Sequence, residues 1–281
     1  MNTYTPSLLR PRAAQRGFTL VELMVTVAIA LFLLGGLVTI VQNVRIANMN
    51  QTRLAQLQDE QRFAMTVIAD AVQAGGYFAD PTTQSNSVID LPVAANPAPT
   101  NPYAAGSPFA GSHTVGALDT AALDTIATRF QTGVSFPGGP VQGPILCDGT
   151  DTSQKAADTW SIQFSLQAIA GVSTLMCTVS SLNGTVSASG GAAVPLVPNV
   201  VAMAIYYGVK RDFTVANNYN VDTYVTWDKM VKVGTADDFS NVSAVRIVLT
   251  FANPLFPQAG QQPTITMERV VEVMNRAGPY T

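Results

Sequence analysis

The chain is poor in the side chains that enzymes use for catalysis. Its 281 residues include one histidine, two cysteines and only 12 % charged residues. The histidine, His113, lies in a stretch rich in Gly, Ser and Pro, which is typical of a solvated loop residue rather than a general base. There is also no Gly-rich phosphate loop followed by Lys, no His-Glu-x-x-His pair and no Gly-x-Ser-x-Gly elbow. We therefore predict that the chain is not an enzyme and that it binds no cofactor.

Metal ligands are equally scarce. The spacing of Cys147 and Cys177 does not suit zinc, and the chain offers few other soft ligands. Two small acidic clusters, Asp148-Gly149-Thr150-Asp151 and Asp237-Asp238, carry oxygen ligands of the kind that calcium prefers, but neither matches the twelve-residue calcium loop. We interpret both clusters as solvated turn aspartates and predict no metal site.

The charge balance excludes a basic surface for nucleic acid. The net charge is −3, and three of the 15 basic residues, Arg10, Arg12 and Arg16, precede the first long apolar run. We therefore predict no nucleic-acid partner. Arginines just before an apolar span follow the positive-inside rule, which places the N-terminus in the cytoplasm and everything after Val41 outside it.

No proline occurs between Pro11 and Pro81, which leaves room for one very long helix. Its first part, Phe18–Val41, has 24 residues and a single charge, Glu22. A helix of that length spans about 36 Å, enough to cross a bilayer core of about 30 Å. A carboxylate near the start of a membrane span costs about 2.5–3.5 kcal/mol, so Glu22 needs a function. Composition alone favours an uncleaved signal anchor.

An apolar stripe at helical spacing continues the helix to Ala74, where Gly75-Gly76 is a typical stop. The whole helix would be about 85 Å long. The pair Gly35-Gly36 is either its weak point or a close-packing patch in lipid. The stripe consists of Ala47, Leu54, Leu57, Ala64, Ile68, Ala71 and Val72.

The remainder of the chain predicts short strands separated by Gly, Pro and Asn turns, after an irregular stretch from Asp80 to Val115. Such a pattern indicates an antiparallel sheet assembly rather than β-α-β units. A hairpin is expected from the neighbouring segments 159–167 and 171–179. The expected strands are 125–130, 159–167, 171–179, one within 194–210, 224–230, 242–251 and 264–275.

The two cysteines belong to the exported part, Cys147 in the loop before the predicted hairpin and Cys177 on its second strand. In an oxidising compartment such a lone pair more often forms a disulfide than stays free. The alternative is two unrelated buried thiols, and the sequence leaves it open because geometry decides.

Residues 16–22, Arg-Gly-Phe-Thr-Leu-Val-Glu, resemble the processing site of type IV prepilins, the family of type IV pilins and type II secretion pseudopilins. The resemblance implies cleavage by prepilin peptidase between Gly17 and Phe18, and N-methylation of Phe18. It also implies that Glu22 neutralises the terminal amine of a neighbouring subunit during assembly. Two buried opposite charges attract strongly in a low dielectric, whereas either one alone is penalised. The alternative for Glu22 is a carboxylate that snorkels to the interface without a partner.

Later segments resemble PilW-type minor pilins in the expected order. They are Ala55–Arg62 followed by Gly75-Gly76-Tyr77-Phe78, Leu196–Val200 leading to Tyr206–Val209, and Val242–Ile247. Two features depart from the wider family. Thr39 stands where major pilins often have a helix-breaking proline, which favours a minor subunit with an unbroken helix. The stretch 80–115 has no counterpart in the family that can be aligned.

The resemblance implies an α+β, pilin-like fold, in which a long N-terminal helix packs on an antiparallel β-sheet domain. The expected parts are a cleaved leader 1–17, a membrane or filament-core helix 18–41, its amphipathic continuation 42–76, and a periplasmic or extracellular β-rich domain 77–281. Expected partners are the inner membrane, prepilin peptidase, the pilus assembly platform, other minor and major pilins, and a tip adhesin. The expected function is a minor pilin of the pilus tip that supports twitching motility and adhesion. The alternatives are a minor pseudopilin of a type II secretion system and, more distantly, a membrane-anchored periplasmic enzyme.

Overall fold

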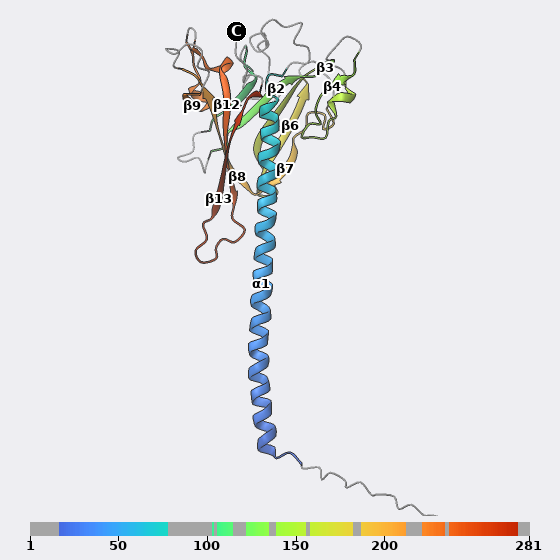
Figure 1. Ribbon diagram of the computed structural model, residues 1–281, viewed down its shortest axis with the longest axis vertical. Helices are drawn as coiled ribbons and strands as arrows, with labels where there is room; N and C mark the ends of the chain where they lie inside the picture. The colour runs from blue at the N-terminus through green and yellow to red at the C-terminus, as the bar shows by residue number, and fades with distance from the viewer. Residues whose placement is uncertain are drawn as a thin grey trace, which may run out of the picture. The chain divides into compact units, whose positions relative to one another are not determined.

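The computed structural model describes residues 17–77, 103, 106–114, 122–134, 139–155, 158–181, 187–211, 221–233 and 236–274. Its contacts divide the chain into two units, Met1–Arg53 and Leu54–Thr281, which are described separately below. One helix, α1 (Leu20–Gln73), belongs to both units, and the strands gather around its C-terminal part (Figure 1).

The predicted long helix is confirmed, with bounds slightly inside those expected from the sequence. It begins two residues after Phe18, ends at Gln73, and remains helical through Gly35-Gly36. The predicted stop is also confirmed. The Gly75 N–H donates to Val72 O at 3.0 Å, and Gly76 takes a positive φ of 75° that suits glycine. A side chain at position 75 would meet the ring of Phe109 at 2.9 Å, so this position also needs glycine for space.

One face of α1 in the second unit enters the hydrophobic core. Its buried residues are Leu57, Ala64, Met65, Ile68, Ala69, Ala71 and Val72. Five of these seven belong to the predicted stripe. Met65 and Ala69 broaden it, as expected for a helix that packs against a flat surface rather than against one partner helix. Ala47, the first member of the predicted stripe, is exposed.

Two antiparallel sheets form the rest of the core, which confirms the predicted α+β fold class. The five-stranded sheet has the order β1-β2-β5-β6-β7, and the four-stranded sheet has the order β13-β12-β8-β9. Both pack against α1 through their apolar inner faces. The bounds are β1 Phe109–Ser112, β2 Thr125–Gln131, β5 Thr159–Ile169, β6 Val172–Ser181, β7 Val194–Pro198, β8 Val200–Val209, β9 Thr223–Val225, β12 Val242–Ala252 and β13 Thr264–Glu272.

Two short strand pairs and three single-turn 3₁₀ helices complete the described part of the chain. The pairs are β3 (Gly133–Val134) with β4 (Val141–Gln142), and β10 (Lys232–Val233) with β11 (Ala236–Asp237). The 3₁₀ helices are Thr152–Gln154, Trp227–Lys229 and Asp238–Ser240.

The predicted hairpin is β5–β6, paired from Trp160 and Ser181 down to Ile169 and Val172. Its two-residue turn, Ala170-Gly171, has φ values of 50° and 82°. Positive φ at both positions matches the twist of the flanking strands, which is why such tight hairpins use this turn.

A single residue connects the two sheets. Strand β7 ends at Pro198 in the five-stranded sheet, and β8 begins at Val200 in the four-stranded sheet. Asn199 lies between them with φ 61°, a conformation that asparagine tolerates better than most residues. The register beside it is irregular, since Thr250 pairs with Ala202 but Phe251 pairs with Val200.

Strict alternation along this strand predicts that Val201, Met203, Ile205 and Tyr207 share one face. The irregularity changes the first of these positions. Met203, Ile205 and Tyr207 do face the core, but Val201 is only partly buried and Val200 is fully buried in its place. A β-bulge turns successive side chains out of strict alternation, which the sequence pattern does not reveal.

Two further expectations were wrong in part. The stretch 80–115 was expected to be irregular, but β1 lies within it and the Tyr103 side chain is fully buried; residues 78–102 lie outside the described residues. The Tyr103 ring lies 4.7 Å from the guanidinium carbon of the buried Arg129, and its hydroxyl bonds with Ser161 Oγ at 2.7 Å. The predicted strand 224–230 ends at Val225 and continues as a 3₁₀ turn, in which Trp227 packs against Tyr207 and Phe239.

Candidate assembly interface

The start of α1 is fixed by a threonine cap. Thr19 Oγ1 accepts a hydrogen bond from the Glu22 backbone N–H at 3.3 Å, and Thr19 O accepts one from the Leu23 N–H at 3.2 Å. Thr19 is therefore the N-cap, and Glu22 is the third helical residue, the Thr-x-x-Glu spacing of a capping box. Thr19 was not among the residues expected to have a function, although the Thr-x-x-Glu spacing is present in the motif.

The cap determines where Glu22 lies. Its carboxylate belongs to the first turn, where the partial positive charge of the helix N-terminus stabilises an anion by about 0.3–1 kcal/mol. The side chain is exposed, and no ion pair of it occurs among the described residues. Glu22 is therefore held close to Phe18, the residue that processing would make the new N-terminus, and remains available to a group from outside the described chain.

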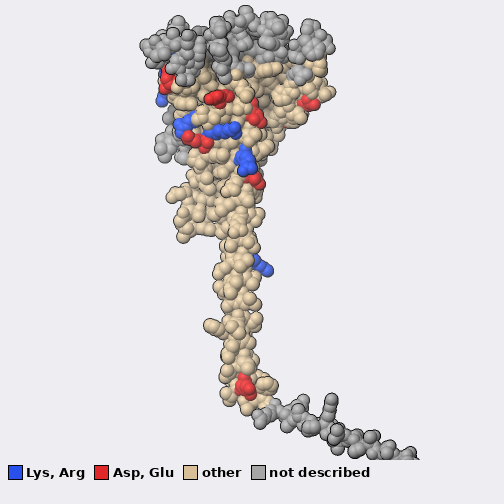
Figure 2. Space-filling model, in the orientation of Figure 1, with Lys and Arg blue, Asp and Glu red and all other residues tan. Residues whose placement is uncertain are grey.

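The surface of α1 after Glu22 is apolar on every side. Large hydrophobic side chains from Leu20 to Met49 are all exposed, Phe32 by 82 %. Among the described residues α1 is the one helix that is long and apolar enough to cross a membrane. The helix carries only isolated charges there, whereas the second unit, Leu54–Thr281, called the strand-rich unit below, carries many (Figure 2). A helix that is hydrophobic all round is stable only in lipid or among other apolar helices.

Two threonine hydroxyls in this apolar part are satisfied within the helix itself. The Thr26 hydroxyl donates to Leu23 O at 2.9 Å, and the Thr39 hydroxyl donates to Gly35 O at 3.0 Å. A hydroxyl bonded to its own backbone can enter a bilayer or a filament core without an unsatisfied donor. Thr39 therefore leaves the helix continuous at a place where a proline would break it.

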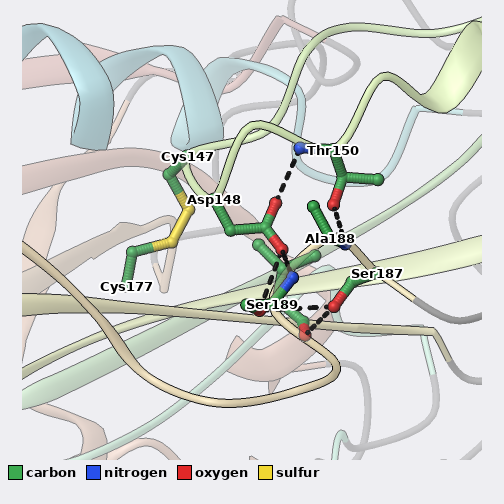
Figure 3. The surroundings of a disulfide bond; sticks show 8 residues. Cys147, Asp148, Thr150, Cys177, Ser187, Ala188 and Ser189 are labelled. Atoms are coloured by element: carbon green, nitrogen blue, oxygen red, sulfur yellow. Dashed lines mark hydrogen bonds between the residues drawn. A yellow bond between two sulfur atoms is a disulfide. The ribbon is translucent and has the colours of Figure 1, made fainter.

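In the second unit, the two cysteines form a disulfide (Figure 3). Their Cα atoms are 6.3 Å apart, and the bond joins the loop after β4 to the fully buried Cys177 on β6. The two cysteines are 30 positions apart in the sequence.

The neighbouring Asp148 belongs to the loop that the disulfide anchors, and its carboxylate accepts hydrogen bonds from other residues of the fold. It accepts hydrogen bonds from the Thr150 N–H at 2.9 Å, the Ser189 N–H at 3.1 Å and the Ser189 hydroxyl at 2.9 Å (Figure 3). Burial alone would raise the pKa of Asp148, but these hydrogen bonds outweigh it and lower the pKa. Asp148 is therefore a structural link between two loops, not the solvated turn residue expected from the sequence.

The second acidic cluster also differs from the expectation. Asp238 is fully buried, and its Oδ2 lies 2.5 Å from Nη2 of Arg211, which also donates to Lys229 O at 3.0 Å. The side chain of Asp237 lies outside the described residues. No group of three or more metal-binding side chains occurs in the described part of the chain.

His113 is not a solvated loop residue. Its Nδ1 lies 2.9 Å from Oδ1 of Asp124, and only 16 % of its side chain is exposed. The nearly fully buried Asp124 also accepts hydrogen bonds from the Thr114 N–H and, on β8, from the Ile205 N–H. This aspartate joins the β1–β2 segment to the four-stranded sheet, and His113 completes its set of donors.

Comparison with known protein families gives two matches. The family model described as the prokaryotic N-terminal methylation motif matches residues 12–38, and that of the type IV pilus-assembly protein W, PilW, matches residues 162–273. Together the two matches support a type IV prepilin-family pilin. No curated protein and no solved structure matches it.

Each of the two matched regions lies in one of the two units of the chain. The methylation motif covers the Thr19 cap, Glu22 and the first part of the apolar helix. The PilW match runs from β5 to the end of β13 and so contains the whole four-stranded sheet. These matches point to a structural, pilus-related pilin, and the motif with its long apolar helix is that of a single-pass membrane-anchored protein.

Proposed function

We propose that the chain is a minor pilin that helps to initiate assembly of the type IV pilus and lies in its tip complex. The observation that carries the proposal is the presence of both the methylation motif and a PilW match on one chain. The unbroken helix at Thr39 supports a minor rather than a major subunit. In this position the chain supports twitching motility and adhesion through the filament, together with a tip adhesin.

Processing would precede assembly. Prepilin peptidase cuts between Gly17 and Phe18, and Phe18 becomes the methylated N-terminus. The arginine-rich leader keeps that end in the cytoplasm, so the strand-rich unit folds in the periplasm and reaches the cell surface with the pilus. The partners at this stage are the inner membrane, the assembly platform, and the other minor and major pilins.

Glu22 is the assembly contact in this proposal. When the apolar part of α1 leaves the bilayer for the filament core, its carboxylate needs a cation in a medium of low dielectric constant. The methylated amine of a neighbouring pilin is such a cation. Leaving a buried charge without its partner costs about 3–5 kcal/mol, which is enough to prevent incorporation. The Thr19 cap supports this role because it keeps the carboxylate in the first helical turn.

The test compares three variants in a host strain that lacks the native gene. Glu22→Ala removes the charge, Glu22→Asp keeps it on a shorter side chain, and Asp59→Ala removes an exposed carboxylate from the same helix. We expect Glu22→Ala to abolish the chain's presence in sheared pili, Glu22→Asp to reduce it, and Asp59→Ala to leave it unchanged. Normal incorporation of Glu22→Ala would refute the charge-pair proposal.

The same strains separate the pilus from type II secretion. Deletion of the gene should abolish surface pili and twitching while secreted enzymes stay at their normal level. Loss of secretion with normal piliation would instead assign the chain to the pseudopilins.

A further inference from the structure

An apolar cleft opens in the strand-rich unit between α1, the disulfide loop and the five-stranded sheet. Its volume is about 420 Å³. Phe63, Val67, Ala71 and Ala74 line it from one face of α1, at the helical spacing of one ridge. The floor is formed by inward-facing residues of the sheet, among them Phe130 on β2. A cavity of this size lies in the range of ligand and side-chain binding sites.

The disulfide loop, residues 144–149, carries Cys147 and lines the side of the cleft opposite α1. This rim of the cleft is called the lip below. The loop is fixed by the disulfide, by the Leu146 N–H that donates to Thr150 O at 2.8 Å, and by the Ile145–Asp151 bridge. A binding surface that is already rigid loses little conformational entropy on association.

This rigid loop holds an isoleucine away from the core. Ile145 is 73 % exposed, the largest exposure of any large hydrophobic residue in the described part of the second unit. Phe63, on the opposite side of the cleft, is 49 % exposed. A small ligand inside the cleft would leave both side chains in water, whereas the surface of a second protein would cover them together with the cleft.

One charged residue lines the cleft, Asp70 on α1. Its side chain is exposed, and its carboxylate has no ion pair or hydrogen bond among the described residues. An apolar cleft with a single acidic group is complementary to an apolar side chain that has a basic residue close by.

We propose that this cleft is a docking site for a neighbouring pilin subunit, which inserts a large apolar side chain into it and places a Lys or Arg against Asp70. The inference rests on the proposed function, because that function supplies the pilin neighbours. It adds a specific surface on the strand-rich unit to the contact made by the helix.

Photo-crosslinking of the full chain in its native host tests the proposal. p-Benzoylphenylalanine is introduced in place of Ile145 at the lip, or in place of Phe256, which is 52 % exposed and does not line the cleft. We expect the probe at the lip to give an adduct with another pilin and the probe at the control position to give none. Equal yields from the two positions, or an adduct with lipid alone, would overturn the proposal.

Three further variants, one of them a control, test the chemistry of the cleft. Asp70→Lys should lower the yield of the adduct about fivefold, since exposed ion pairs contribute up to about 1 kcal/mol. Glu272→Lys, the matched charge reversal at an exposed position on β13, should leave it unchanged. Ala74→Phe, which fills the cleft, should also lower the yield; resistance of the strand-rich unit to limited proteolysis shows that each variant is folded. An adduct that Asp70→Lys and Ala74→Phe both leave unchanged would contradict the docking site.

The wild-type chain separates failure of the docking site from failure of the proposed function. If the unmodified chain co-purifies with other pilins in mild detergent while the lip forms no adduct with them, the cleft is not their docking site. If the unmodified chain co-purifies with no pilin, the proposed function itself is refuted.

Discussion

Removal of the disulfide is the change whose effect on stability follows most directly from the structure. The bond joins Cys147 to Cys177, which are 30 positions apart in the sequence. In the chain-entropy account, a closed loop of that length lowers the entropy of the unfolded chain enough to stabilise the fold by about 3.6 kcal/mol. Replacing both cysteines by alanine should therefore lower the free energy of unfolding of the strand-rich unit by about that amount.

Urea unfolding of the full chain in detergent measures this difference. The two tryptophans, Trp160 and Trp227, both belong to the strand-rich unit, so their fluorescence reports on that unit and not on the apolar helix. With an unfolding slope of about 3 kcal/mol per molar urea, the midpoint should fall by about 1.2 M. Reductant should lower the urea midpoint of the wild type to that of the double variant, and should leave the midpoint of the double variant unchanged.

Either of two results would refute a stabilising role of the disulfide. A midpoint that moves by less than about 0.3 M, or a wild type that is alkylated at both cysteines without reductant, would show that the two thiols do not constrain the unfolded chain. The disulfide also holds the loop that carries Ile145. The double variant should therefore lose most of the lip-dependent adduct even where it remains folded.

Three further predictions concern single positions. Mass spectrometry of the chain from its native host should give methylated Phe18 as the first residue, and an N-terminus at Met1 would refute the proposed processing. Asn199→Gly should leave the free energy of unfolding within about 0.5 kcal/mol of the wild type. Asn199→Val should lower it by about 1–2 kcal/mol, because a β-branched residue does not tolerate a φ of 61°. Equal effects of the two substitutions would show that the backbone relaxes at this position. The lowered pKa of Asp148 means that its stabilising contribution is complete above the unfolded value of about 3.9 and is lost as the pH falls through the folded value. The difference in stability between the wild type and Asp148→Asn should therefore narrow below about pH 4, and a difference independent of pH would contradict it.

The sequence predicted well those features that depend on local pattern. The long helix, its stop at Gly75-Gly76 and the β5–β6 hairpin follow from periodicity, from glycine and from alternation, all of which act over a few residues. The family could likewise be recognised from seven contiguous residues at the start of the apolar run.

The features that were missed depend on tertiary contacts. Tyr103 lies in a stretch whose sequence predicts neither a helix nor a strand. It is buried because Arg129 and Ser161 lie opposite it on other strands. Trp227 ends a predicted strand because it packs against Tyr207 and Phe239 rather than continuing the ladder. No local rule identifies such partners, since each contact joins residues that are distant in the sequence. The same limit applies to the cleft, which exists only because α1 and the disulfide loop both lie over the inner face of the five-stranded sheet.

The order of strands in the five-stranded sheet has a consequence for how such pilins diverge. The PilW match begins at residue 162, within β5, so β1 and β2 lie outside the region shared with that family. These two strands are added at one edge of the sheet, where β2 pairs with β5 from Ile126 to Gln131. A sheet can be extended at its edge without changing the pairing of the strands already present, and the extension covers backbone groups that would otherwise promote aggregation. This edge is therefore a place where related chains can acquire new surface while the shared strands keep their register.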